Sequence, residues 1–200
     1  MGKPRPYVEA SKREHFDMER PATIDEVLEF WIEAGPDQWF SRDEGFDEAC
    51  RQRFLATYEA AARGDLAEWE LDPRGALALL ILLDQFPRNM FRGTRRAYAT
   101  DSTAVLTAER AIERGFDQAV EPELRRFFYL PFMHSEEMPH QERSVALNEA
   151  LGEEDSIHWA RHHRDIIARF GRFPHRKEIL GRESTADERA YLADQGAFAG

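Results

Sequence analysis

Apolar side chains recur along this chain at the three- to four-residue spacing of amphipathic helices. Over residues 24–31 they occupy positions i, i+3, i+4 and i+7, and Thr23 with Glu26 has the spacing of a capping box. The segment 43–63 has a similar apolar face and is followed by Gly64, a residue type that often ends helices. These patterns predict two helices at the start of the chain.

A third helix is predicted to begin at Asp72-Pro73, an N-cap followed by proline at the first helical position. Its residues 77–83 are apolar on every side, which places this helix at the centre of the fold. Pro87 disfavours the helical conformation at the residue before it. We therefore expect the buried helix to end at Phe86, with polar groups gathered at its end.

The helical pattern continues to the end of the chain. Further helices are predicted over about 101–114, 121–131 with an interruption at Pro131, 139–151, 155–170 with Asp155 as the cap, and a short stretch after Thr185. No alternation typical of β-strands extends over a useful length. The predicted fold class is all-α, with antiparallel helical hairpins stacked as a bundle or a short solenoid.

The composition indicates one folded domain. A chain of 200 residues with 42% hydrophobic residues buries a substantial core, and we assign residues 23–200 to it. Residues 1–22 are charged and contain prolines, and we expect a flexible arm without a signal peptide. The lone Cys50, on the apolar face of its helix, permits no internal disulfide. We expect a cytoplasmic protein.

Charge is distributed unevenly. The net charge of −11 argues against nucleic-acid partners and acidic membrane surfaces, which both require a positive face. Residues 84–96 nevertheless carry four Arg against one Asp, and residues 161–182 carry six Arg and one Lys against two acids. Clustered guanidinium groups repel one another, so they call for an anion. This anion is a bound phosphate, sulfate or carboxylate, or else carboxylates of the chain, with Asp84, Glu136 and Glu183 neutralising Arg88, Arg172 and Arg176.

Histidine supplies the candidate acid–base chemistry. On the helix predicted over 155–170, His163 falls within the apolar stripe and should point inward. An inward histidine is either a hydrogen-bonded core residue or a proton-transfer group.

The sequence His134-Ser135-Glu136 has three interpretations. His134 and Glu136 with His163 or His175 are possible metal ligands, but the spacing matches no zinc motif, and we assign no metal. Ser135 lacks the Gly-x-Ser-x-Gly turn of a nucleophile. In the third interpretation these residues only begin a helix.

The polar residues fall within five short segments of the chain. They are residues 82–89 (LLDQFPRN), 129–141 (including YLP, HSE and Gln141), 163–167 (HRDII), 170–176 (FGRFPHR) and 180–185 (LGREST). In this order they resemble the bacterial domain-of-unknown-function family numbered nine hundred and twenty-four, over about residues 24–192. The resemblance implies a fold similar to tetratricopeptide repeats and no catalytic assignment. Lys177 departs from the family, which usually has Asn after Pro-His-Arg; if that amide contacts a ligand, selectivity differs here.

We expect one pocket that binds a small anionic ligand, with possible histidine-assisted, hydrolase-like acid–base chemistry and no identified cofactor. The candidates are His134, His163 and His175 for proton transfer, Arg88, Asn89, Gln141, Arg172, Arg176 and Arg182 for ligand binding, and Asp84, Ser135 and Glu136 as supporting residues. The first alternative is a peptide-interaction module whose groove clamps a carboxylate, with Trp39 and Phe40 exposed. The second is a purely structural network of buried polar groups.

Overall fold

The computed structural model describes residues 20–194, and within this range the ordered elements are all helical. The α-helices are α1 (Ile24–Ala34), α2 (Pro36–Trp39), α3 (Glu44–Arg63), α4 (Pro73–Leu80), α5 (Phe86–Met90), α6 (Asp101–Glu113), α7 (Arg126–His134), α8 (Met138–Leu151), α9 (Glu154–Phe170), α10 (Lys177–Leu180) and α11 (Ala186–Ala193). The short helices are η1 (Ala67–Leu71), η2 (Ile81–Gln85), η3 (Arg95–Tyr98), η4 (Phe116–Ala119), η5 (Pro122–Leu124) and η6 (Pro174–Arg176). The prediction of an all-α fold is confirmed.

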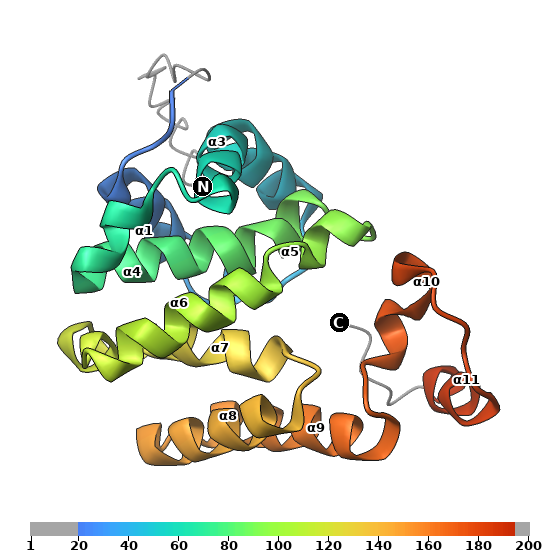
Figure 1. Ribbon diagram of the computed structural model, residues 1–200. Helices are drawn as coiled ribbons and strands as arrows, with labels where there is room; N and C mark the ends of the chain where they lie inside the picture. Colours follow the sequence, from blue (N-terminus) through green and yellow to red (C-terminus); the bar gives the residue numbers. More distant parts are fainter. Residues whose placement is uncertain (1–19, 195–200) are drawn as a thin grey trace, which may run out of the picture.

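Successive helices pack as neighbours through most of the chain. Helix α4 packs against α1 and α6, α6 against α7, α7 against α8, and α8 against α9. Figure 1 shows α1, α4, α6 and α7 from top to bottom, with α8 and α9 together at the bottom and α10 and α11 set to one side. We call residues 20–170 the helical body and residues 171–194 the C-terminal segment.

The N-terminus of α1 closes as its sequence predicts. Thr23 and Glu26 form the capping box, and Ala22 donates its backbone N–H to the Thr57 hydroxyl at 2.7 Å. Residues 1–19 of the predicted arm lie outside the described residues, whereas Ala22 at its end is buried against α3.

One apolar core runs through the helical body. Helix α4 is buried on every side from Ala76 to Leu80, as predicted, and Phe54, Phe86 and Phe127 are almost inaccessible to solvent. A second, smaller cluster joins Ile166 and Ile167 to Phe173. The C-terminal segment therefore meets the body through few apolar side chains.

The predicted end of the central helix at Phe86 is wrong. Residues Ile81–Gln85 form a π-helical turn, and helix α5 follows directly with Pro87 in its first turn. A π turn shifts the hydrogen-bond register by one residue, so the missing N–H of Pro87 falls at the start of a new helix. The chain therefore stays helical from Pro73 to Met90.

Two smaller expectations also fail. Pro131 lies inside α7 and does not interrupt it, because the fully buried rings of Phe128 and Phe132 hold this helix in the core. Helix α9 has Glu153 at its N-cap, and Asp155 lies in the first turn instead.

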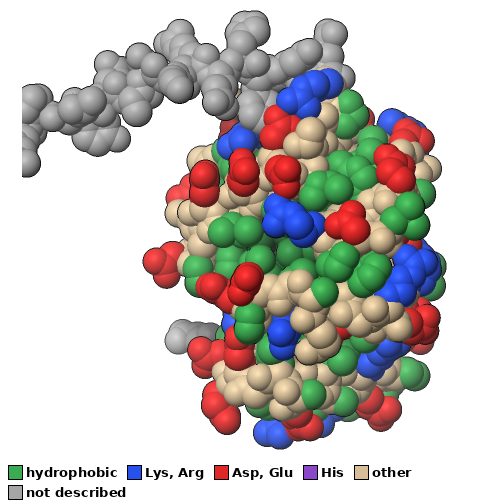
Figure 2. Space-filling model, turned by 90° about the vertical axis from the view of Figure 1, so that its left-hand side faces the viewer, with side chains coloured by type: hydrophobic (Ala, Val, Ile, Leu, Met, Phe, Trp, Pro, Cys, Tyr) green, Lys and Arg blue, Asp and Glu red, His purple; other side chains and the backbone are tan. Residues whose placement is uncertain are grey.

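The described helices include none that is both long and apolar enough to cross a membrane. On the face shown in Figure 2, Lys and Arg side chains are scattered among Asp and Glu.

Candidate functional site

The candidate site is built around the carboxylate of Asp84, which is 1% exposed. His134, at the end of α7, places its Nδ1 2.8 Å and 2.9 Å from the two oxygens of Asp84. The π turn of η2 carries Asp84, and π turns often occur at functional positions. The hydroxyl of Thr100 donates to the carbonyl of Leu83 at 2.6 Å, next to Asp84 in this turn.

The electrostatics fix which nitrogen of His134 carries the proton. Burial opposes ionisation of Asp84, but Arg88 and His134 outweigh it and lower the pKa of the carboxyl to about 2. Burial lowers the pKa of His134, and Arg88 lowers it further against the opposing effect of Asp84. A neutral imidazole beside an ionised carboxylate donates from Nδ1, so Nε2 is its basic nitrogen.

Arg88 and Arg176 meet at a second carboxylate, that of Asp101. Arg88 lies within 3.1 Å of Asp101 Oδ1 and within 3.2 Å of Asp84 Oδ1. Arg176, from η6, donates to Asp101 Oδ2 at 3.3 Å and to the carbonyl of His134 at 3.0 Å. Two arginines far apart in sequence therefore share one negative charge, which the chain itself supplies.

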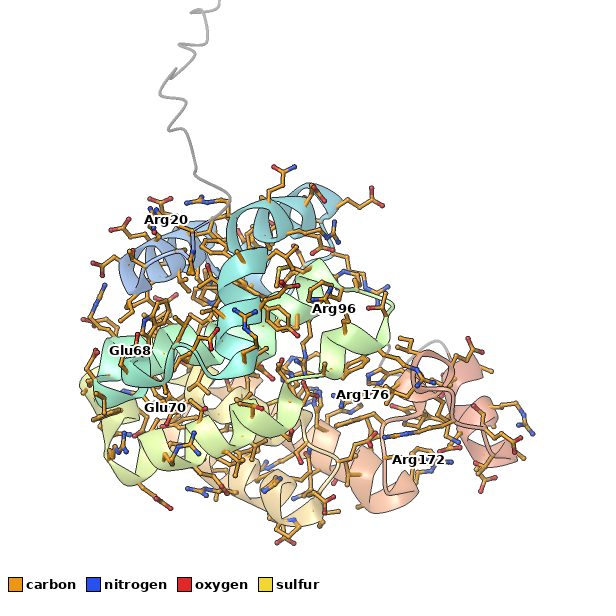
Figure 3. All side chains as sticks on the ribbon, turned by 45° about the horizontal axis from the view of Figure 1, so that its top comes forward. Arg20, Glu68, Glu70, Arg96, Arg172 and Arg176 are labelled. Atoms are coloured by element: carbon orange, nitrogen blue, oxygen red, sulfur yellow. The ribbon has the colours of Figure 1, made fainter. Side chains whose placement is uncertain are left out.

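The guanidinium of Arg176 packs against two aromatic rings. Its central carbon lies 4.5 Å from the ring centroids of both Tyr98 and Phe173. Figure 3 shows Arg176 at the junction of the C-terminal segment and the helical body. Its side chain is 7% exposed, and its Nε is buried without a hydrogen-bond partner. Burial and the nearby Arg88 lower its pKa despite Asp101.

His163 points inward, as its position in the apolar stripe predicts. Its Nδ1 lies 2.8 Å from the carbonyl of Trp159, so this nitrogen is the donor, and its ring centroid lies 6.3 Å from that of His134. Burial, followed by His134, lowers its pKa to about 3. At neutral pH His163 is an uncharged imidazole beside His134.

His175 joins the same electrostatic environment from the C-terminal segment. Burial lowers its pKa to about 3, and three guanidinium groups, those of Arg176, Arg88 and Arg42, contribute to the shift. Its ring lies 5.6 Å from that of Phe173. All three candidate histidines are therefore neutral at pH 7, while the arginines near them remain charged.

Two other candidate arginines have carboxylate partners outside this centre. Arg182 donates to Glu136 at 2.7 Å and 3.0 Å, and Glu136 also accepts the backbone N–H of Phe173 at 3.0 Å. Arg172 donates to Glu188 at 2.9 Å. The predicted alternative, in which the carboxylates of Glu136 and Glu183 neutralise Arg172 and Arg176, is therefore wrong for these residues. Glu183 accepts from Arg172 through its backbone carbonyl, and Glu136 binds Arg182.

Lys177 is buried and contacts Glu188 of α11. Its ammonium group binds the Glu188 carboxylate and the carbonyl of Glu183. Burial opposes ionisation of Glu188, but Arg172 and Lys177 lower its pKa to about 2. Lys177 is thus part of the internal framework of the C-terminal segment.

The remaining candidates do not join the His134 centre. Asn89 donates to Asp47 of α3 at 2.8 Å. Gln141 donates to backbone carbonyls at the end of α7, and Ser135 lies 2.8 Å from His140. These contacts fix the turn between α7 and α8. The interpretation of Ser135 as a helix-start cap is wrong, because Ser135 is the C-cap of α7 and the N-cap of α8 is Glu137, which has no side-chain cap hydrogen bond.

Three contributors were missed by sequence reasoning, namely Asp101, Tyr98 and Arg42. Asp101 is the first residue of α6, where an acidic residue is expected for helix stability alone. The sequence did contain one indication of its role, because Asp101 follows shortly after the arginine-rich residues 84–96.

The residues described here include no group of three His, Cys, Asp or Glu placed to hold a metal ion. A hollow of about 400 Å³ lies elsewhere, lined by residues of α1, α2 and α3 that include Phe30, Phe46 and Arg53.

Fold and site together define an all-α protein with a buried Asp–His–Arg network where its C-terminal segment meets the helical body. The chain belongs to the family described as bacterial protein of unknown function (DUF924), whose model matches residues 27–196. Among solved structures, the protein of unknown function ATU0120 from Agrobacterium tumefaciens is 51% identical, with a TM-score of 0.83 over 85% of this chain and 96% of its own. The comparison with curated proteins found no match. The tetratricopeptide-like packing stays a prediction.

Proposed function

We propose that the centre formed by Asp84, His134 and Arg176 binds a small anionic ligand, with His134 as the proton acceptor for this ligand or for a water molecule beside it. The observation that carries the proposal is Arg176, a buried guanidinium whose Nε–H has no acceptor. Buried donors without partners are rare in native proteins, and a carboxylate or phosphate oxygen is a strong partner for such a donor.

The charge around Arg176 supports an additional anion. Asp101 is shared with Arg88, and the pKa of Arg176 stays below its ordinary value because burial and Arg88 outweigh that carboxylate. A buried cation whose charge is only partly balanced is stabilised by one more negative charge beside it. The rings of Tyr98 and Phe173 pack against the guanidinium, and such stacking helps to orient an arginine for a ligand.

The state of His134 supports a proton-accepting role. Asp84 orients the ring and fixes its tautomer, as a carboxylate does in many general-base sites. Because the pKa of His134 is lowered by burial, the imidazole is neutral at pH 7 and its Nε2 is ready to take a proton. The corresponding class of chemistry is hydrolysis or proton abstraction in a cytoplasmic protein.

Thermal unfolding with inorganic phosphate, sulfate or acetate tests the binding. An anion at one hundred times its dissociation constant raises the free energy of unfolding by about 2.7 kcal/mol. We expect one anion to stabilise the native protein and Arg110→Gln equally, and Arg176→Gln much less. Arg110 is the control because it pairs with Glu70 in the body, away from His134. Equal stabilisation of all three proteins, or of none, contradicts the proposal.

A structural role for the network is the second candidate, favoured by the carboxylate partners of Arg172 and Arg182. It predicts a large loss of stability for His163→Ala and no anion binding. The peptide-clamp alternative required exposed Trp39 and Phe40. Trp39 is buried against Trp31 and only Phe40 is exposed, so this alternative loses its aromatic surface.

A further inference from the structure

The C-terminal segment follows a helix-ending glycine. Helix α9 ends at Gly171, whose φ of +68° lies in the left-handed region where a non-glycine residue is strained. Beyond it, η6, α10 and α11 lie beside the body rather than within the stack (Figure 1). Gly171 therefore marks the boundary between the two parts.

The C-terminal segment is tied together internally by one buried carboxylate. Glu188 of α11 binds Arg172 at the start of the segment and Lys177 of α10, and it accepts the backbone N–H of Thr185 at 2.7 Å. The packed neighbours of η6 include α10 and α11. Contacts that join its beginning, middle and end make this segment a single unit.

Polar anchors attach this unit to the body at three places. Arg176 binds Asp101 and the carbonyl of His134, and Arg182 binds Glu136. Arg95 of η3 donates to the carbonyl of Ile179 at 3.2 Å. The apolar contribution comes from the small cluster around Phe173.

The unit covers the histidine centre. The ring of Phe173 lies 5.6 Å from that of His163, and Arg176 reaches the carbonyl of His134. In the closed arrangement His163 is 5% exposed and Arg176 is 6% exposed. A ligand therefore reaches this centre when the C-terminal segment moves.

We infer that residues 171–194 form a lid that opens as one unit about Gly171 and is held over His134 and His163 by the anchors of Arg176, Arg182 and Arg95. The more exposed anchor, the Arg182–Glu136 ion pair, is screened by salt, whereas the apolar core of the body is not. Salt therefore opens the lid without unfolding the body. The inference explains access to the proposed ligand site, but the opening itself requires no ligand.

Hydrogen exchange of the full-length protein without added anion tests the lid. Between 50 mM and 500 mM sodium chloride, amides of residues 171–194 should lose protection together, by roughly fivefold to tenfold, while those of α4 and α7 keep theirs. If residues 171–194 exchange only when the whole protein unfolds, at every salt concentration, the inference is overturned. Exchange of α10 and α11 at independent rates also overturns it.

Two variants sharpen the test. Glu136→Gln weakens the contacts to Arg182 and to the backbone of Phe173, and should increase opening about tenfold at low salt. Glu70→Gln removes a comparable carboxylate partner of Arg110 within the body and should leave exchange of residues 171–194 unchanged. Equal effects of the two variants on the C-terminal segment contradict the lid. Because no anion is used, failure of anion binding leaves this result unaffected.

Discussion

His134 donates from Nδ1 to the carboxylate of Asp84, a residue 50 positions earlier in the chain, at 2.8 Å and 2.9 Å. The contact joins the π turn that follows α4 to the end of α7. Asp84→Asn keeps the shape but removes the buried negative charge beside Arg88 and His134, which leaves Asp101 as the carboxylate shared by Arg88 and Arg176. Losing one partner of a buried charged pair costs about 3–5 kcal/mol.

The check is urea unfolding of Asp84→Asn beside Glu70→Gln. The second variant breaks a partly exposed ion pair with Arg110, which is worth at most about 1 kcal/mol. Similar losses in the two variants would show that burial of Asp84 adds nothing.

Acid should destabilise this protein through His163. Its pKa is lowered from 6.5 to about 3, chiefly by burial. Between these two values the unfolded chain binds a proton that the folded chain excludes, so the free energy of unfolding falls as the pH falls. From pH 7 to pH 5 this residue alone costs about 2 kcal/mol.

Urea unfolding at pH 5, 6 and 7 measures that slope. His163→Gln should have a shallower pH dependence than the native protein, whereas His158→Gln, on the exposed side of the same helix, should retain the native slope. An unchanged slope in His163→Gln would falsify this assignment.

Aromatic packing in the body predicts a contrast between two phenylalanines. Phe54 is fully buried and stacks on Phe86 with ring centroids 4.7 Å apart, so Phe54→Ala should cost about 3–5 kcal/mol. Phe40 is 57% exposed, and Phe40→Ala should change stability by less than about 0.5 kcal/mol. Chemical denaturation of both variants gives the comparison, and a small loss for Phe54→Ala would contradict the core assigned to it.

Lys177 and Glu188 form a buried pair that calls for a double-mutant cycle. Glu188→Leu leaves the buried ammonium of Lys177 without a carboxylate and should cost about 3–5 kcal/mol, whereas Lys177→Met leaves Glu188 paired with Arg172 and should cost less. The double variant should cost clearly less than the sum, since it buries neither charge. Unfolding free energies of the four proteins give the coupling, and strict additivity would exclude a direct interaction.

The helices and the inward position of His163 were predictable because both follow from local apolar spacing. The π turn was not, because its extra residue leaves no periodic signal and Pro87 suggested a break. Pro131 misled for a similar reason, since tertiary packing keeps α7 continuous through it.

In the candidate site, sequence identified the residues that carry charge but not their partners. Arg88 and Arg176 meet, yet the carboxylate between them belongs to Asp101, which resembles an ordinary helix-start acid. The partners of Arg172 and Arg182 depend on how residues 171–194 fold back, and no local pattern encodes that path.

The four tryptophans fall into two groups by their exposure to solvent. Trp31, Trp39 and Trp69 are buried in the body, whereas Trp159 on α9 is 46% exposed and touches three histidine rings. A collisional quencher in solution therefore reaches Trp159 first, and the emission that remains comes from the core indoles. The native chain thus carries its own fluorescent reporter beside the histidine centre, without any added label.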